Sequence, residues 1–524
     1  MQRNAITKNT PSKAMDAVDL TVFASRISSV CEEMGAVLRR TAFSPNIRDR
    51  LDFSCAVFDV HGRLVAQAAH IPVHLGSMAY AMADVVARFE PVHGDVLVFN
   101  DPFLGGTHLP DVTLVAPVFV EGRLMGFVAN RAHHADIGAV TPGSMPLSTR
   151  LEEEGMVIPP QRLYAGGVCC EEVLNGITGA TRNPSQAAGD FAAQASSVRT
   201  GASRLGELVR RVGVDGYPRA VAALNEYAER LVRSGVAAMP DGRYRFRDLM
   251  DDDGQGNPDV AIQVVVEVSG GEAVVDFTGT SSQTTGNINC PLPVAAAAVY
   301  YVFRCLMPEH TPACAGAFSP VRITAPEGCL VNARRPAAVA AGNVETSQRI
   351  VDAVCGALAE ALPGRIPAAS HGSMNNLAMG GGVGGDGWDY YETMAGGAGG
   401  GPAGPGRSAI HTHMTNTLNT PVEALEMAYP LRIRRYAVRR GTGGAGLHRG
   451  GDGVVREYEL LAPAEATLIT ERRRHCPWGL AGGGAGAAGE NRLNGEPLPG
   501  KAQCRLQPGD RLEIATPGGG GWGR

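Results

Sequence analysis

A mixed α+β fold with several lobes is predicted by the 524-residue sequence, and three observations support it. Apolar residues recur every three or four positions in some segments, as in amphipathic helices, while other segments form short β-like runs between turn residues. A chain of this length exceeds one ordinary hydrophobic core and implies roughly two to four lobes. Glycine occurs 68 times and clusters toward the end, which indicates tight turns and close backbone packing there.

The first lobe is expected to span residues 17–190, after a flexible tail at 1–16. An amphipathic helix is expected at 17–40, because Phe23, Ile27 and Val30 begin an apolar spacing of three to four residues. Antiparallel hairpins are expected where turn residues separate paired β-like runs. The elements expected after this helix are strands at 52–58 and 63–67, a helix at 76–89, a strand at 95–100, and strands at 112–120 and 124–131.

A central α/β lobe is expected at 191–375, and a glycine-rich, mostly β lobe at 376–524. The elements expected in the central lobe are helices within 190–237, a turn at 251–254, a hairpin of strands at 261–268 and 273–277, and helices at 293–306 and 345–361. Residues 379–407 are expected to form a long loop or a set of packed turns. From residue 430 onward, short β-like runs alternate with glycine turns.

The composition argues against several classes of function. The net charge of −5 disfavours nucleic-acid and anionic-membrane partners, and no run approaches the ~18 consecutive apolar residues of a membrane span. None of the few lysines lies in a G-x-x-x-x-G-K-[ST] loop, so phosphate-loop binding of ATP, Schiff-base chemistry and pyridoxal phosphate are not expected. The N-terminus lacks the apolar core of a signal peptide, and the 11 cysteines form no C-x-x-C pair. A cytoplasmic protein with reduced thiols is therefore expected.

The strongest chemical signal is a group of histidine and aspartate residues around the second hairpin. His108, Asp111 and His133 are residue types that bind Zn²⁺, Mn²⁺ or Fe²⁺. If the hairpin turn centres on Gly122, the antiparallel register places His133 opposite Asp111, with Cβ atoms ~4.5–5.5 Å apart. Pro110 interrupts the strand, so His108 can fold back from a glycine-rich loop toward the same point. The sequence therefore predicts a site for one divalent metal, with open positions for water or substrate.

The residues beside His133 are expected to have other roles. Neighbouring residues on a strand face opposite sides, so His134 is not expected to bind the same metal. Asp136 is a candidate for orienting an imidazole from outside the ligand set. The alternative for each of these histidines is a hydrogen-bonded loop residue.

Three weaker signals leave alternatives open. His411 and His413 share one face of a β-like run and could form a second metal or phosphate site, although a polar loop is the favoured interpretation. The run from Asp251 to Gly254 resembles the start of a calcium loop but lacks the glutamate required at its end, so a turn is expected. Five arginines could either bind phosphate or form a salt-bridged interface: Arg432, Arg434, Arg435, Arg439 and Arg440.

A collinear series of motifs extends from about residue 18 to residue 523. The first motifs are Arg50-Leu51-Asp52-Phe53-Ser54-Cys55, Ile71 to Met78, Gly94 to Pro102, Gly105 to Asp111, Ala132 to Gly138, Pro142 to Met145, and Glu154 to Pro160. The later motifs are Asp276 to Thr280, Thr415-Asn416-Thr417 with Pro421 to Glu423, Arg449 to Gly451, and Pro517 to Gly523. Together they resemble the hydantoinase B/5-oxoprolinase family.

The resemblance implies a division of labour between two subunits. In this family a hydantoinase-A-type subunit with an actin-like ATPase fold binds ATP and phosphorylates a carbonyl or amide oxygen, and the B-type subunit completes the reaction. The low charged fraction of 19%, against roughly 25% in average soluble domains, also suggests that other protein covers part of the surface. A hetero-oligomer is therefore expected.

The resemblance also implies residues and a reaction. In the related acetone carboxylases the metal ligands resemble His108, Asp111 and His133, and Asp52 is a candidate further ligand. The implied reaction is hydrolysis of a small cyclic amide, such as a hydantoin, 5-oxoproline or another lactam. Phosphorylation makes its carbonyl carbon electrophilic, and water at a Zn, Mn or Fe ion can attack it.

Two candidates and two alternatives complete the expectations. His74 or Asp136 is hypothesised to move a proton during the reaction. One alternative is the metal subunit of an ATP-dependent ketone carboxylase, although such subunits are longer than 524 residues. The other alternative is a non-catalytic scaffold for the ATPase partner.

Overall fold

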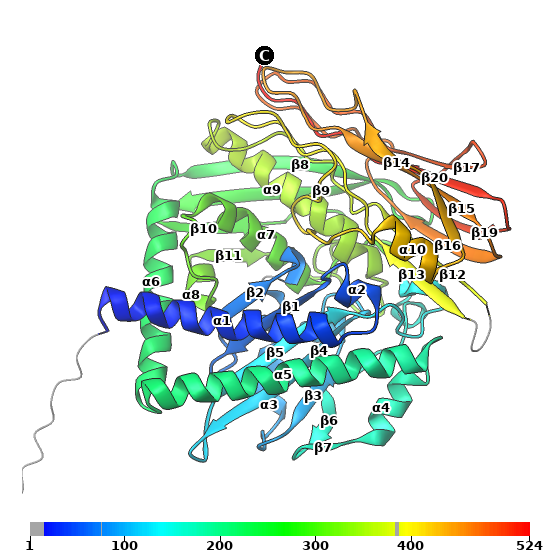
Figure 1. Ribbon diagram of the computed structural model, residues 1–524. Helices are drawn as coiled ribbons and strands as arrows, with labels where there is room; N and C mark the ends of the chain where they lie inside the picture. The colour runs from blue at the N-terminus through cyan, green and yellow to red at the C-terminus, as the bar shows by residue number, and fades with distance from the viewer. Residues whose placement is uncertain (1–14, 75, 383–386) are drawn as a thin grey trace, which may run out of the picture.

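The computed structural model in Figure 1 describes residues 15–74, 76–382 and 387–524. Helices are combined with antiparallel sheets throughout, so the predicted α+β class is confirmed. Positions 1–14 of the expected tail lie outside the described residues, whereas Asp16 caps the first helix by accepting a hydrogen bond from the Asp19 amide at 2.8 Å. None of the helices in the described ranges combines the length and hydropathy that a membrane span needs.

A seven-stranded sheet occupies the first part of the chain. Its strands are β1 (Phe53–Phe58), β2 (Leu64–Ala69), β3 (Val96–Phe99), β4 (Asp111–Val120), β5 (Arg123–His133), β6 (Gln161–Ala165) and β7 (Val168–Cys169). Their order is β2-β1-β5-β4-β3-β6-β7, and every neighbouring pair is antiparallel. The two hairpins predicted for this part of the chain are confirmed by the β1–β2 and β4–β5 pairs.

Helices cover both faces of this sheet (Figure 1). The helices of this part are α1 (Ala17–Thr41), α2 (Pro45–Arg48), α3 (Ser77–Arg88), α4 (Glu171–Thr178) and α5 (Pro184–Val212). Alternate residues of β1 point to opposite faces of the sheet. Cys55 and Val57 pack toward α1 and α5, while Ala56 and Phe58 pack toward α3. The helices predicted at 17–40 and 76–89 are confirmed by α1 and α3.

The central part combines a four-stranded sheet with helices. Its elements are α6 (Gly216–Ala237), β8 (Gly242–Asp252), β9 (Pro258–Ser269), β10 (Glu272–Asp276), α7 (Leu292–Leu306), α8 (Ala315–Phe318), β11 (Val321–Thr324), and α9 (Ser347–Ala361). The strand order is β11-β10-β9-β8, with β10 and β11 parallel. A π-helical turn, η5 (Gly342–Thr346), leads into α9, which packs across β8 and β9.

Two further sheets and one helix form the C-terminal part. Their elements are β12 (Asn376–Gly381), β13 (Trp388–Glu392), α10 (Val422–Ala428), β14 (Leu431–Arg439), β15 (Gly453–Leu460), β16 (Ala464–Ile469), β17 (Glu490–Leu493), β18 (Glu496–Leu498), β19 (Lys501–Leu506), and β20 (Arg511–Ala515). The strand orders are β13-β12-β16-β19 and β14-β15-β20-β17-β18.

The expectation of loops and turns over residues 379–407 is corrected at its start. β12 and β13 pair there as antiparallel strands, with Met379 opposite Tyr390. The strands form because Leu377, Met379 and Tyr390 fill the core between the C-terminal sheets. After β13, close packing of glycines continues: a Cβ on Gly450 would lie 2.0 Å from the Gly519 carbonyl oxygen. The predicted close backbone approach is therefore present.

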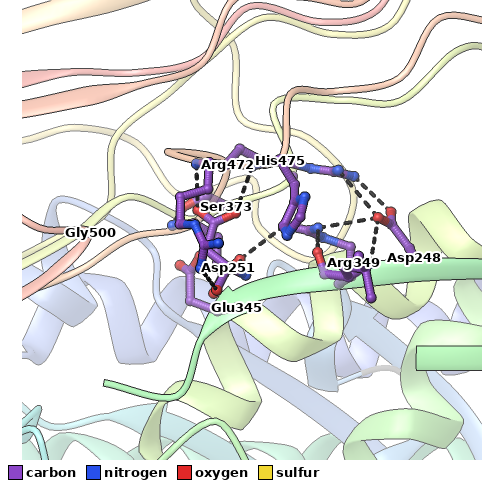
Figure 2. A network of polar contacts seen from close by, with 12 residues as sticks. Asp248, Asp251, Glu345, Arg349, Ser373, Arg472, His475 and Gly500 are labelled. Carbon is purple, nitrogen blue, oxygen red and sulfur yellow. Dashed lines mark hydrogen bonds and ion pairs between the residues drawn. The ribbon is translucent and has the colours of Figure 1, made fainter. Parts of the chain in front are cut away.

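Buried charged side chains join the central part to the C-terminal part (Figure 2). Arg349 of α9 lies 3.4 Å from Asp248 of β8 and 3.1 Å from Glu471. Arg472 lies 2.9 Å from both Asp248 and Asp352. Each buried charge faces an opposite one, because an unpaired charge would be strongly disfavoured there. These ion pairs fix how the two parts meet, while the predicted division into lobes stays a prediction.

Candidate metal centre

Asp111 and His133 face each other because of the register of the β4–β5 hairpin. They form a cross-strand pair, as the sequence predicts. The turn residues Glu121 and Gly122 have φ values of 53° and 75°, which suit a two-residue hairpin turn. A bulge after Val118 shifts the register by one residue: Phe119 pairs with Leu124 next to the turn, whereas Val118 pairs with Gly126 beyond the bulge, and this shift brings Asp111 opposite His133.

His108 reaches the same point from the loop that precedes β4. Gly105 has a φ of 86°, and a Cβ there would lie 2.1 Å from the backbone nitrogen of Ala81, so the loop packs directly on α3. The Asn100 side chain holds the end of the loop by donating to the Leu109 carbonyl at 2.8 Å. The loop therefore has one defined path that delivers the His108 imidazole to the hairpin.

Three candidate ligand atoms form an equilateral triangle. His108 Nε2, His133 Nδ1 and Asp111 Oδ1 each lie 3.2 Å from the other two. For an ion about 2.1 Å from each atom, the ligand–metal–ligand angles would be about 100°, as in a transition-metal site with open positions. Among the described residues, this is the one group of three or more potential side-chain ligands close enough to hold a metal ion. The donor set and its spacing thus fit a metal.

The remaining contacts of Asp111 fix its orientation and its charge. Its Oδ2 accepts a hydrogen bond from Thr107 Oγ1 and lies 3.3 Å from His74 Nε2. Burial alone would raise the pKa of this carboxyl, but the adjacent His108 and His133 hold the pKa well below its usual value. Asp111 is therefore ionised and can bind a cation.

Both histidines of the triangle keep their second ring nitrogen buried without a hydrogen-bond partner in the described structure, namely His108 Nδ1 and His133 Nε2. The His133 ring stacks on Tyr391, with 4.7 Å between ring centroids and 18° between ring planes. Aromatic packing therefore holds the His133 ring in place.

The triangle faces a small cavity of about 20 Å³, which is space for about one water. Three distant parts of the chain supply its walls. The residues other than the triangle are Asp52, Ile71, Val73 and His74 from the first part, Asn343 and Val344 from η5, and Met374, Tyr391, Thr393, Thr415 and Thr417 from the C-terminal part. This space is smaller than a cyclic amide.

Two further residues that the sequence singles out, Asp52 and His74, also lie at this cavity. The His74 ring is held at its other nitrogen, since Nδ1 lies 3.0 Å from Ser54 Oγ. His134 points away, as expected, and its Nε2 lies 2.9 Å from Gln194 Oε1. The side chains of the adjacent residues His133 and His134 therefore point in different directions, and only His133 belongs to the triangle.

Asp136 does not line the cavity. Its carboxylate accepts hydrogen bonds from the Gly138 amide at 2.9 Å, Ser144 Oγ at 2.9 Å and the Arg182 amide at 2.6 Å. β5 ends at His133 and the chain then turns away, so closeness in sequence does not become closeness in space. The geometry therefore gives no support to Asp136 as a proton carrier or as a residue that orients an imidazole.

The weaker sequence signals have mainly structural roles. Within the described ranges, His411 and His413 belong to no group of three ligands that could hold a metal. Arg434 and Arg439 each pair with a glutamate, at 2.7 and 2.9 Å, so salt bridges occupy part of the arginine group. Asp251 accepts hydrogen bonds from three backbone amides of the C-terminal part. The carboxylate of Asp251 is thus bound by backbone amides of the protein, which gives this run a structural role.

Sequence reasoning missed part of the cavity wall. Asn343 of η5 places its Nδ2 3.5 Å from Asp111 Oδ2. Although π turns often occur at functional sites, they have no apolar periodicity that reveals them in a sequence. Thr393, Thr415 and Thr417 were also missed as site residues. The one available signal was that Thr415 and Thr417 belong to a family-like motif.

The fold and the site define the class of this protein: it is a mixed α+β protein in which two imidazoles and one carboxylate lie at a small buried cavity. The family model for hydantoinase B/oxoprolinase matches residues 16–524, so the chain belongs to this family. The chain is 40% identical to 5-oxoprolinase 1 of Arabidopsis thaliana over 97% of its own length, but it spans only 42% of that protein. It is 33% identical to the putative B-type subunit of a D-/L-hydantoinase from Pseudomonas sp. strain NS671, covering 98% of this chain and 91% of that one.

Two solved structures share the fold. The ATP-dependent caprolactamase from Pseudomonas jessenii is 30% identical with a TM-score of 0.91, covering 97% of this chain and 91% of that chain. A nucleotide-free acetone carboxylase has a TM-score of 0.88 at 18% identity, covering 98% of this chain and 77% of that chain, and it shows the fold alone. The names of the relatives support a family of ATP-dependent amidases.

Proposed function

We propose that this chain is the metal-binding subunit of an ATP-dependent cyclic amide hydrolase and works with a hydantoinase-A-type ATPase subunit. The observation that carries the proposal is the triangle of His108, Asp111 and His133 at a small cavity, with 3.2 Å between each pair of ligand atoms. The family and the names of its oxoprolinase and caprolactamase members favour a cyclic amide as the substrate.

In the proposed reaction the partner transfers the γ-phosphoryl group of ATP to the amide oxygen, which removes the resonance that protects the carbon. Water adds to that carbon, the ring C–N bond breaks, and the nitrogen leaves with a proton as an amine. A second water hydrolyses the resulting acyl phosphate to a carboxylate and inorganic phosphate. A divalent ion of Zn, Mn or Fe would supply Lewis-acid polarisation and a lowered pKa for water in this cavity.

His74 is the residue proposed to move the proton. Its ring is held by Ser54 Oγ at 3.0 Å and lies 3.3 Å from Asp111 Oδ2, at the edge of the cavity. An imidazole in this position can take a proton from water and return it to the leaving nitrogen. Asp52 is proposed as a further metal ligand, and its carboxylate lies 3.6 Å from Arg50 Nη2.

The ATPase partner is proposed for two reasons. This chain has no G-x-x-x-x-G-K-[ST] loop for the phosphates of ATP. In addition, one relative is named as the B-type component of a hydantoinase, and the plant 5-oxoprolinase contains more than twice the length that this chain covers. The ATP-dependent step therefore belongs to another polypeptide in this proposal.

Metal analysis of the purified protein tests the proposed centre. We expect about one transition-metal ion per chain, because three protein ligands with open positions suffice for a bound ion. His133→Ala should lose this metal. His134→Ala is the matched control, since His134 is the adjacent buried histidine but contacts Gln194. Equal metal content in wild type and His133→Ala would show that the assigned site is wrong.

Turnover by the chain reconstituted with an A-type ATPase tests the proposed reaction. We expect phosphate release that depends on a hydantoin, 5-oxoproline or another lactam and that stops in His133→Ala. A ketone with bicarbonate is the contrasting substrate. ATP turnover with the ketone alone would instead assign the chain to the carboxylases, and turnover that is insensitive to His133→Ala would leave it as a scaffold.

A further inference from the structure

Three threonines form a connected chain of hydroxyl groups in the wall of the cavity. Thr393, Thr415 and Thr417 all line the cavity and are almost completely buried. Thr417 Oγ1 lies 2.8 Å from Thr393 Oγ1 and 3.3 Å from Thr415 Oγ1. Because bulk water does not reach these groups, their hydrogen bonds are made to one another or into the cavity.

Arg50 gives this chain of hydroxyls a direction. Its guanidinium is completely buried, and Nη2 lies 3.4 Å from Thr393 Oγ1, while Nη1 donates to the Tyr391 carbonyl at 2.7 Å. A guanidinium has only donors, so Thr393 accepts from it, and this leaves the hydrogen of Thr393 available to point toward Thr417 Oγ1 at 2.8 Å. The positive charge at one end also polarises the hydroxyls beyond it.

A count of hydrogens leaves one donor free for the cavity. The three hydroxyl groups carry three hydrogens, but only two oxygen–oxygen contacts join them, and each contact uses one hydrogen. Over the part of the chain that the structure describes, these oxygens contact no other acceptor. When Thr393 donates to Thr417, the remaining hydrogen lies on Thr415 or Thr417.

We propose that this hydroxyl chain donates a hydrogen bond to the carbonyl oxygen of the acyl phosphate, which becomes negative when the second water adds to the acyl carbon and makes it tetrahedral. The inference rests on the proposed function, because it requires an acyl substrate beside the metal triangle. The cavity of about 20 Å³ admits about one oxygen-sized group, which would meet both the triangle and the hydroxyl wall. A donor fixed in a site that excludes water stabilises such a charge much more than water does.

Thr417→Val tests the centre of the chain, because valine has the shape of threonine without the hydroxyl group. We expect kcat/KM of the reconstituted enzyme to fall about 100- to 1000-fold, mainly through kcat, as when an oxyanion donor is removed. Thr417→Ser restores a hydroxyl group and should recover most of the activity. Thr412→Val is the matched control, since Thr412 is buried in the same loop but contacts His371 Nδ1. Wild-type kcat/KM in Thr417→Val would overturn the proposal.

Formate binding to the Co²⁺-loaded protein, followed by visible absorption, provides a readout without turnover. We expect Thr417→Val and Thr415→Val to take up Co²⁺ normally but to bind formate about tenfold more weakly, the effect of one lost hydrogen bond. Thr412→Val should bind formate as the wild type does.

The outcomes of this binding experiment separate the two proposals. Equal formate affinity in all variants would overturn the hydroxyl donor and leave the metal centre intact. Loss of Co²⁺ from the threonine variants would also overturn it, because the hydroxyls would then support the metal site itself. Failure of the wild type to take up Co²⁺ would refute the proposed metal function and, with it, the donor.

Discussion

Replacing Glu345 by glutamine tests whether a buried carboxyl group beside the cavity wall stays protonated. Glu345 lies in η5 and is completely buried among the polar groups of Figure 2. Its Oε1 accepts hydrogen bonds from the Met374 amide at 2.9 Å and from Asn376 Nδ2 at 2.6 Å. Glutamine keeps the shape and this acceptor, but it cannot ionise.

The magnitude follows from the position of this pKa. Burial, together with the nearby Glu471 carboxylate, raises the pKa of Glu345 from 4.5 to about 8. Because the folded-state pKa lies above the unfolded value, the stabilisation is complete below pH 4.5 and is lost progressively as the pH rises to about 8. Each pKa unit corresponds to ~1.4 kcal/mol, so the wild type loses about 5 kcal/mol of unfolding free energy across this window.

Urea unfolding followed by circular dichroism measures the effect. Glu345→Gln should resemble the wild type at about pH 5 and should be several kcal/mol more stable than it at about pH 8, since only the wild type must ionise. Glu360→Gln, on the exposed surface of α9, is the control and should follow the wild type at both pH values. A stability difference between Glu345→Gln and wild type that does not change with pH would refute the reasoning.

Three other substitutions have definite expected outcomes. Gly342→Ala should lower the melting temperature, because its Cβ would lie 1.9 Å from the Asn289 carbonyl oxygen; an unchanged value in a thermal scan would contradict this packing. Glu392→Gln removes the buried partner of Arg456 and should cost about 3–5 kcal/mol in urea unfolding, whereas a loss well below that range would mean the pair is not isolated from water. Asp136→Asn should keep its metal in elemental analysis, and metal loss would contradict its placement outside the cavity.

The ligand hairpin could be predicted from the sequence because local features determine it. The turn at Glu121 and Gly122 sets the register to within one residue, so counting along the strands places Asp111 beside or opposite His133, and the bulge after Val118 makes the two directly opposite. Pro110 marks the point where the strand begins, so the return of the His108 loop could also be expected. Local turn chemistry and a strand period of two therefore predict that these ligands are neighbours, while the bulge sets the final register.

The opposite wall of the cavity could not be predicted in this way. Thr393, Thr415 and Asn343 come from segments far from the hairpin, and only packing between remote elements brings them to the cavity. Asp136 shows the converse case, since it follows His133 closely in sequence but binds Ser144 and its own loop. Similarly, β12 and β13 arise from the core that they help to fill, and a high glycine content obscured them.

The order of the cavity residues along the chain bears on how an ion could enter the site during biosynthesis. The triangle of His108, Asp111 and His133 lies within one short stretch that leaves the ribosome early. Its covering residues, including Asn343, Tyr391 and Thr415, are synthesised much later. A nascent first sheet could therefore capture a metal ion while its ligands are still open to solvent. In the mature protein the same ion would be enclosed, and exchange would require the later segments to separate from the sheet.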